Sequence, residues 1–515
     1  MKGYLNLEIS DPGKRVFETP ARQVTLVGLW EKKLPDPGRF LGLPARQAIQ
    51  LLAGYEIDGC CFVVEKDTEE TVAEIFAYRG PATAHEVYFA AGQNGNWILS
   101  NMFRSVLGSL PLNRRDVSPE GFLDFLLFQH SPLPESPIGA IRRLGHGDLL
   151  CVDRRGAPRI STLSRLEIPG PPSDFRDGAD MIEKTLSLAV ESLPKGVLNL
   201  LSGGIDSTLV QVFLGPGHAA VTASIDSPEL AFERDYATQA ASLCGVTLQD
   251  IGLVEREFPI LLERETSMAR LPLPLLQIPV ISAAFDNCAP HFSSGFAADA
   301  LFSLTRSSRE LILKGGDPGS FNMEDFSISS ERPVIEGIFG KEAVKKRICM
   351  RNEYVRSRIG EPESFSDLNL GCLASYYSSS FLAYRQLAAA RGKTLSSPFK
   401  DRRLVQAALS LPIPERIFRK SVFKPVLKDI LSRRLPPYPL ELEKGGFGLP
   451  RTRFCKSGPL RGYFRENPLP DLIITGSKAD PVLRPDWGSS MTTFRCIAWS
   501  MWERSLKEIS REETL

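Results

Sequence analysis

The sequence predicts a two-domain protein in which a β-rich α+β domain is followed by an α/β domain with a parallel sheet. The chain has 515 residues, more than a single domain usually needs. Short apolar runs separated by turn residues recur in the first third of the chain, whereas strands alternate with helices further on. Such alternation is typical of parallel sheets with crossover helices. We therefore place one domain at 1–166 and another at 176–515, joined by a linker at 167–175.

The first domain is expected to contain strands with two helices between them. Each strand is a short apolar or alternating run, and the second helix begins with an acidic residue, Glu120, as its dipole favours. This mixture predicts layered α+β packing. The expected strands are 24–27, 61–64, 74–78, 87–90, 97–100 and 149–152, and the expected helices are 45–53 and 119–128.

The linker is predicted from three prolines and a glycine within residues 167–174, which can continue neither a helix nor a sheet. Beyond it the pattern alternates regularly. The expected order is a helix at 179–192, a strand at 196–201, a helix at 208–213, a strand at 220–225 and a helix at 234–244. The chain from about residue 398 is expected to be helical and interrupted by prolines.

Composition excludes several classes of protein. Lys and Arg number 62 against 61 Asp and Glu, so no global field favours nucleic acid or a membrane surface. The nine cysteines form no C-x-x-C pair, which argues against disulfide frameworks and thiolate zinc sites. The five histidines lie far apart, so zinc and histidine triads are unsupported. Neither an apolar leader nor about 18 consecutive apolar residues occur, so a cytoplasmic location is expected.

A glycine-rich segment, Ser-Gly-Gly-Ile-Asp-Ser, lies between an expected strand and an expected helix. Gly203 and Gly204 would let backbone N–H groups approach an anion at a helix N-terminus, and Ser202 and Ser207 can donate hydroxyl hydrogen bonds. Asp206 would repel a phosphate, so a bridging cation, Mg²⁺, is expected. The segment predicts a polyphosphate site, and a capped glycine turn without a ligand is the alternative.

This loop resembles the pyrophosphate-binding loop of the N-type ATP pyrophosphatases, which adenylate a carboxyl group or a carbonyl oxygen. Within them the sequence is most similar to the asparagine synthetase branch, because further stretches follow in that branch's order. The resemblance implies an adenine nucleotide α-hydrolase-like synthetase domain behind an Ntn-type, glutaminase-like domain. The matching stretches are 224–237, 294–302, 397–405, 424–436 and 443–450, with fainter similarity at 57–62, 77–80 and 141–148.

The resemblance also implies site residues and two cofactors, ATP and Mg²⁺. Ser224 and Gly295 fall in stretches that would bind the nucleotide. Asp299 takes the place of a second Mg²⁺ ligand beside Asp206. Lys444 matches a lysine that would neutralise charge on the acyl-adenylate and the departing pyrophosphate, as a catalytic group.

Other residues allow more than one interpretation. Lys424 and Lys428 fit one helix face, from which they could approach phosphates or face solvent. Phe381 and Tyr384 fall at helical spacing, which favours a place in the core over a substrate cage. Arg385 beside them could bind a carboxylate.

Departures from the family pattern narrow the expected reaction. Asparagine synthetases use a cysteine at position 2 as the glutaminase nucleophile, whereas this chain has Lys2, so its first domain is expected to be structural and to release no ammonia from glutamine. The amine must then come from the substrate, as in β-lactam synthetases and the macrolactam synthetases that close lasso peptides. Phe296 occupies the position of a tyrosine in the catalytic pair of β-lactam synthetases, and phenylalanine accepts no proton.

The sequence therefore predicts ATP-dependent closure of a lasso peptide, in which the N-terminal amine attacks an adenylated Asp or Glu side chain. A β-lactam or other small-molecule amide synthetase is the alternative, and an inactive binding module is a third. No general base is assigned. The expected partners are a precursor or core peptide, a leader-binding protein and a leader peptidase, without nucleic acid or membrane.

Overall fold

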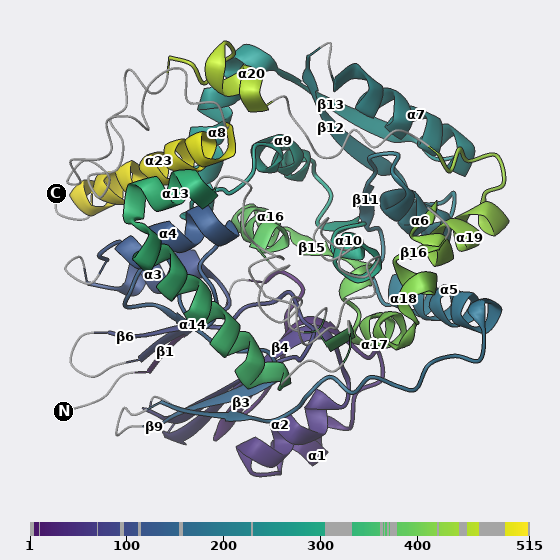
Figure 1. Cartoon of the computed structure of the whole chain (residues 1–515). Helices are drawn as coiled ribbons and strands as arrows, with labels where there is room; N and C mark the ends of the chain where they lie inside the picture. Colours follow the sequence, from purple (N-terminus) through teal and green to yellow (C-terminus); the bar gives the residue numbers. More distant parts are fainter. Residues whose placement is uncertain are drawn as a thin grey trace.

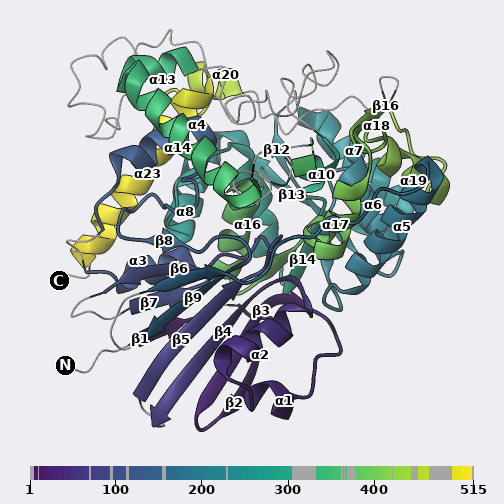
Figure 2. The same ribbon diagram turned by 60° about the horizontal axis from the view of Figure 1, so that its bottom comes forward.

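The protein is described from a computed structural model. It describes residues 5–9, 11–68, 71–92, 97–111, 115–153, 158–227, 230–303, 332–360, 364, 366–367, 370, 379–419, 422–441, 451–462 and 490–512. The sheets of the first 162 residues lie at one end of the molecule and the helices around a parallel sheet lie at the other (Figures 1 and 2).

The first 162 residues form a four-stranded and a six-stranded sheet. The four-stranded sheet has the order β1 (Leu5–Glu8), β7 (Trp97–Ser100), β6 (Tyr88–Ala91), β8 (Arg142–Arg143). The six-stranded sheet is antiparallel, with the order β10 (Arg159–Thr162), β9 (Asp148–Asp153), β5 (Thr71–Arg79), β4 (Glu56–Thr68), β3 (Arg22–Trp30), β2 (Arg15–Thr19). The helices here are α1 (Pro37–Leu41), α2 (Ala45–Ala53), α3 (Phe103–Ser109) and α4 (Pro119–Phe128).

Successive side chains of β4 point to opposite faces of the sheet, so this one strand contributes to two apolar layers. Cys61 and Val63 point to one face of the sheet, where they pack against α1 and α2. Cys60 and Phe62 point to the other face and pack against strands β6 and β7 of the second sheet. The predicted strands are all present, and α2 and α4 have the predicted bounds. The sequence pattern missed the four strands at the sheet edges, β1, β2, β8 and β10. The residues of β2 and β10 are partly or fully exposed, so these strands lack a clear apolar pattern.

A five-stranded parallel sheet forms the centre of the remaining chain, which confirms the predicted parallel α/β sheet. Its order is β13 (Leu248–Val254), β12 (Ala220–Asp226), β11 (Leu198–Leu200), β14 (His291–Ser294), β15 (Thr394–Ser396). Leu200 pairs with Val221 of β12 on one side and with Ser294 of β14 on the other. Because the strand order reverses beside β11, the crevice at its carboxyl end is the expected ligand position.

Helices surround this sheet (Figure 1). Those that follow its strands or flank them are α5 (Phe175–Glu191), α6 (Ile205–Leu214), α7 (Ala231–Cys244), α8 (Phe258–Ala269), α9 (Gln277–Ser282), α10 (Ala298–Phe302), α16 (Ser379–Ala390), α17 (Arg402–Ser410) and α19 (Pro425–Arg434). The other elements are η4 (Glu255–Glu257), η5 (Ala283–Asp286), η7 (Pro398–Lys400), α13 (Arg332–Phe339), α14 (Lys341–Ile359), α18 (Ile413–Arg416), β16 (Phe418–Arg419), β17 (Val422–Phe423), α20 (Arg451–Lys456) and α23 (Ser490–Glu512). Among the described helices, none combines the length and the apolar character that a membrane span requires.

The two parts of the chain share one apolar core. Phe122 and Phe125 of α4 pack against Trp499 of α23, with ring centroids 4.8 and 5.5 Å apart. The same cluster contains Tyr88 from the first part and Tyr384 from α16. Residues from both ends of the sequence therefore stabilise each other's position.

Candidate functional site

The glycine-rich loop joins the end of β11 to the start of α6, as predicted. Gly203 has φ +76°, and a Cβ there would overlap the backbone of Tyr236. The backbone N–H of Ser202 donates to Ser207 Oγ over 3.2 Å, and Ser207 Oγ donates to the Gly204 carbonyl over 3.2 Å. Ser207 therefore closes the loop around the N-terminus of α6, where backbone N–H groups attract anions.

Replacing Gly203 by alanine is expected to lower the free energy of unfolding by about 2 to 5 kcal/mol. Left-handed backbone strain costs about 1 to 2 kcal/mol and crowding about 1 to 3 kcal/mol. Gly245 is the matched control because it adopts the left-handed conformation, with φ +65° and ψ +36°, but has open space within 4 Å of the position that an alanine methyl group would occupy. Urea unfolding of both variants decides the matter, and equal losses would show that crowding at Gly203 is unimportant.

The two predicted metal ligands meet at one point beside the loop. Asp206 lies in the first turn of α6 and Asp299 in the first turn of α10. The Nζ atom of Lys424 is 2.6 Å from Asp206 Oδ2 and 2.6 Å from Asp299 Oδ1. The Lys424 side chain is only 3% exposed. Burial alone would lower the pKa of Lys424, but the two carboxylates raise it overall, so it remains an ammonium.

Asp206 and Asp299 fit a magnesium ion. Within the described part of the chain no group of three or more His, Cys, Asp or Glu side chains gathers to hold a metal. Mg²⁺ usually takes one or two protein carboxylates and completes its coordination with water and substrate phosphates. The Asp299 side chain is 51% exposed, so its oxygens are accessible from solvent. That these residues hold Mg²⁺ stays a prediction, and Lys424 would share the carboxylates with the ion.

Lys424 is the site residue for which the sequence allowed two interpretations. It precedes Pro425, the first residue of α19, and has φ +52°, so it caps the helix instead of lying on its face. Lys428 points elsewhere and donates to Glu441 over 2.8 Å. Proline favours the first position of a helix, so Pro425 marks the start of α19. The sequence could thus have placed Lys424 before the helix and Lys428 within it.

Tyr438 is a site residue that the sequence did not suggest. Its buried hydroxyl donates to the carbonyl of Gly203 over 2.6 Å. Burial raises the pKa of Tyr438 to about 12, so the hydroxyl keeps the proton that it donates. The loop is thereby fixed from the side of α19.

Gly295 lies against the start of α6, whereas Ser224 does not reach the loop. A Cβ on Gly295 would be 2.6 Å from the backbone N of Ser207, so only glycine permits this approach. The hydroxyl of Ser224 donates to Asp250 Oδ1 over 3.1 Å. The nucleotide-binding roles of Gly295 and Ser224 stay predictions.

Phe296 is stacked on a buried tyrosine. The rings of Phe296 and Tyr384 are 4.5 Å apart with an interplanar angle of 17°. The Tyr384 hydroxyl is buried without a hydrogen-bond partner, and burial raises the pKa of Tyr384 far above its usual value. Phe381 and Tyr384 belong to the core, as the sequence favoured. Neither ring of the stacked pair can therefore act as a base at neutral pH.

The cysteines of β4 are chemically inert in this structure. Cys60 and Cys61 are fully buried, and burial raises the pKa of both thiols. A thiol, unlike a thiolate, is a poor nucleophile. Lys2 and Lys444 lie outside the described residues, so the roles predicted from them stay predictions.

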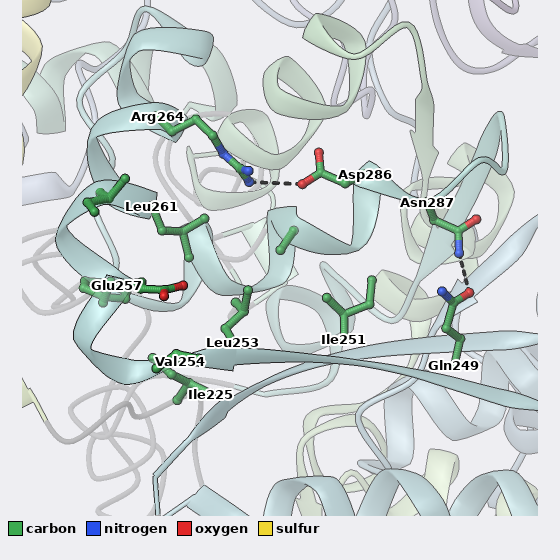
Figure 3. A pocket seen from close by; sticks show the side chains of 13 residues that line it. Ile225, Gln249, Ile251, Leu253, Val254, Glu257, Leu261, Arg264, Asp286 and Asn287 are labelled. Carbon is green, nitrogen blue, oxygen red and sulfur yellow. Dashed lines mark hydrogen bonds and ion pairs between the residues drawn. The ribbon is translucent and has the colours of Figure 1, made fainter.

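One groove of the described residues lies apart from the glycine-rich loop. Its volume is about 370 Å³, and Ile251 and Leu253 of β13 face Leu261 of α8 across it (Figure 3). Arg264 and Asp286 form an ion pair of 3.1 Å at one side. No residue of the loop lines this groove, so it is not part of the candidate site.

Comparison with known protein families gives a match. The family model for asparagine synthase matches residues 357–471, which is less than half of the chain and includes Lys424, Tyr438 and Lys444. No curated protein matches the chain. Members of the asparagine synthase family use ATP, typically with Mg²⁺, and form amide bonds. The match therefore supports an asparagine synthetase-like family and indicates ATP-dependent amide-bond formation in general.

Proposed function

We propose that the protein is an AMP- and pyrophosphate-forming lactam synthetase. The observation that carries this proposal is the convergence of Asp206 and Asp299, from the first turns of two helices, on one cation position beside the glycine-rich loop. A cation held there can neutralise a polyphosphate bound at the N-terminus of α6. The family match supports amide-bond formation as the reaction class.

Different residues would act in the two steps of such a reaction, adenylation and amide formation. The carboxylate oxygen of the substrate attacks the α-phosphorus of ATP, and pyrophosphate leaves. Backbone N–H groups of Gly203 and Gly204 would hold the leaving pyrophosphate, and Lys424 would balance its charge. Mg²⁺, when bound, supplies further charge neutralisation. An amine nitrogen then attacks the acyl carbon, AMP leaves with the bonding electrons, and the nitrogen loses a proton.

The substrate we propose is a peptide whose own N-terminal amine closes a macrolactam on an Asp or Glu side chain. A peptide α-amine has a pKa of about 7.7 to 8.0, so part of it is already neutral near pH 7. This suits a site in which Phe296 and Tyr384 supply no base. A leader-binding protein, a leader peptidase and a cytoplasmic location belong to the same proposal.

Mass spectrometry of a synthetic core peptide with MgATP tests the proposal. We expect the peptide to lose one water for each AMP formed, and its N-terminally acetylated form to give no cyclic product. Cyclisation of a small amino acid instead of the peptide would favour the small-molecule synthetase. ATP consumption without any new amide bond would contradict lactam formation.

A further inference from the structure

We infer that the N-terminal part of the chain, residues 5–162, acts as a positioning element of the synthetase site, with Arg385 as the residue that connects the two. This inference rests on the proposed function, because the site that residues 5–162 would position is the proposed synthetase site. The evidence is a continuous series of direct contacts between the N-terminal sheets and the glycine-rich loop.

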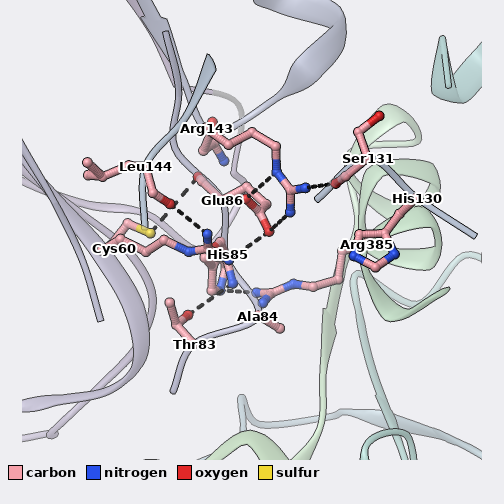
Figure 4. Close-up of polar contacts among 12 residues, drawn as sticks. Cys60, Thr83, Ala84, His85, Glu86, His130, Ser131, Arg143, Leu144 and Arg385 are labelled. Atoms are coloured by element: carbon pink, nitrogen blue, oxygen red, sulfur yellow. Dashed lines mark hydrogen bonds and ion pairs between the residues drawn. The ribbon is translucent and has the colours of Figure 1, made fainter. Parts of the chain in front are cut away.

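The first contact crosses from α16 into the N-terminal part. Arg385 extends from α16 toward His85, as Figure 4 shows, and hydrogen-bonds to its Nε2 atom. Its NH1 atom also forms an ion pair with Asp58 Oδ2 at 3.6 Å. The side chain of Arg385 is 11% exposed and that of Asp58 is completely buried. Two opposite charges are thus buried at the junction. Because moving α16 would separate them away from water, the pair fixes the position of α16.

The N-terminal part holds Asp58 rigidly from its own side. The Oδ1 atom of Asp58 accepts from Thr83 Oγ1 over 2.6 Å and from the Ala84 backbone N–H over 2.9 Å. Burial alone would raise the pKa of Asp58, but the positive charge of Arg385 and the hydrogen bond from Thr83 lower it overall. Asp58 is therefore an anion whose second oxygen faces Arg385. Breaking this pair would leave a buried charge without its partner.

The second contact runs from α16 to the loop after β14. Tyr384, adjacent to Arg385, carries the ring stacked on Phe296, and Phe381 packs on Phe296 from 5.7 Å. The carbonyl of Phe296 accepts from Ser397 Oγ over 2.5 Å. Phe296 is thereby held by its ring contacts with α16 and by the hydrogen bond from Ser397. Because the core is densely packed, a displacement of α16 would also move Phe296.

The third contact joins this loop to the phosphate-binding region. Gly295, next to Phe296, lies directly against the backbone of Asp206 and Ser207 at the start of α6. Asp299 follows four residues later, at the cation position. A shift of α16 would therefore change the separation of Asp206 and Asp299. Such small displacements of a binding site commonly cost much of its activity.

Asp58→Asn and Arg385→Gln test the inference in the full-length protein. Asparagine keeps the acceptor for Thr83 and Ala84 and replaces the charged oxygen that faces Arg385 with an uncharged NH2 group. We expect each variant to weaken MgATP binding, measured by calorimetry, about tenfold to a hundredfold. The double variant should lose no more than the more affected single variant, because both remove the same contact. Unchanged affinity in Asp58→Asn would overturn the inference.

Glu86→Gln is the matched control for general destabilisation. Glu86 is as buried as Asp58 and belongs to the same N-terminal part, but its partners Arg79 and Arg143, each 2.6 Å away, do not lie on α16. We expect this variant to melt earlier and yet to bind MgATP normally. If it weakens MgATP binding as much as Asp58→Asn at a similar unfolding midpoint, the effect is general and the inference is wrong.

Two further measurements keep the test decisive. Arg385→Lys retains the positive charge and can be measured if Arg385→Gln does not fold. Its MgATP affinity should lie between those of the wild type and Asp58→Asn. Hydrogen–deuterium exchange without nucleotide should be faster at residues 294–299 in Asp58→Asn but not in Glu86→Gln. If the wild type fails to bind MgATP, the proposed function fails, while equal exchange in the wild type and Asp58→Asn overturns the positioning role.

Discussion

Replacing either Asp206 or Asp299 by asparagine is expected to reduce the rate of AMP and pyrophosphate formation by about a hundredfold to a thousandfold. Both carboxylates lie at the proposed cation position beside the glycine-rich loop, and an amide oxygen carries no charge to hold a cation there. Asparagine preserves the shape of each side chain, so the fold should persist. Radiolabelled ATP, followed by chromatography of AMP, measures the effect.

Asp286→Asn is the control for this experiment. Asp286 is a half-exposed, ion-paired carboxylate in η5, bound to Arg391 and Arg264, and no contact joins it to the glycine-rich loop. We expect normal turnover in this variant. Should Asp206→Asn or Asp299→Asn also turn over normally, that aspartate is not a magnesium ligand.

Replacing Lys424 by methionine is expected to lower turnover by about a hundredfold to a thousandfold and stability by about 1 to 3 kcal/mol. Loss of the ammonium leaves Asp206 and Asp299 facing each other without a buried cation between them. The stability cost is moderate because Asp299 is half-exposed. Since the two carboxylates raise the pKa of Lys424, the charge persists throughout the neutral range, and its stabilising effect is lost only when the pH rises through that raised value.

Added Mg²⁺ distinguishes a cation site from a mere salt bridge. In Lys424→Met the ion should raise the unfolding midpoint more than it does in the wild type, because the freed carboxylates can bind it. Lys428 lies one turn further along α19, and its partner Glu441 is highly exposed. Lys428→Met should therefore change neither the turnover nor the stability. A midpoint that is insensitive to Mg²⁺ in Lys424→Met would contradict the cation site.

Local patterns predicted the elements that depend on local forces. Helices α2 and α4 have the expected bounds, because one is amphipathic and the other is capped by Ser118 with a proline at its first turn. The glycine-rich loop was recognised because adjacent glycines and serines lie between an expected strand and an expected helix, and in the structure Gly203 adopts a positive φ. Each of these features is encoded within a few neighbouring residues.

Features that depend on tertiary contacts could not be predicted in this way. The sequence allowed Arg385 to bind a carboxylate without indicating which one, and in the structure Arg385 pairs with Asp58, more than 300 residues earlier in the chain. Lys424 meets Asp206 only because α19 packs beside α6. Nothing in the local sequence gives the partner of either cation, since long-range pairing depends on how complete sheets and helices pack.

Isotope transfer from the substrate carboxylate shows whether the protein adenylates its substrate. When the carboxylate of the core peptide is labelled with ¹⁸O and the cyclic product is allowed to form, the account predicts that one labelled oxygen appears in AMP and none in pyrophosphate. This result follows only if the carboxylate attacks the α-phosphorus and AMP leaves when the amine attacks. Label in inorganic phosphate, together with ADP, would show attack at the γ-phosphorus and would contradict adenylation.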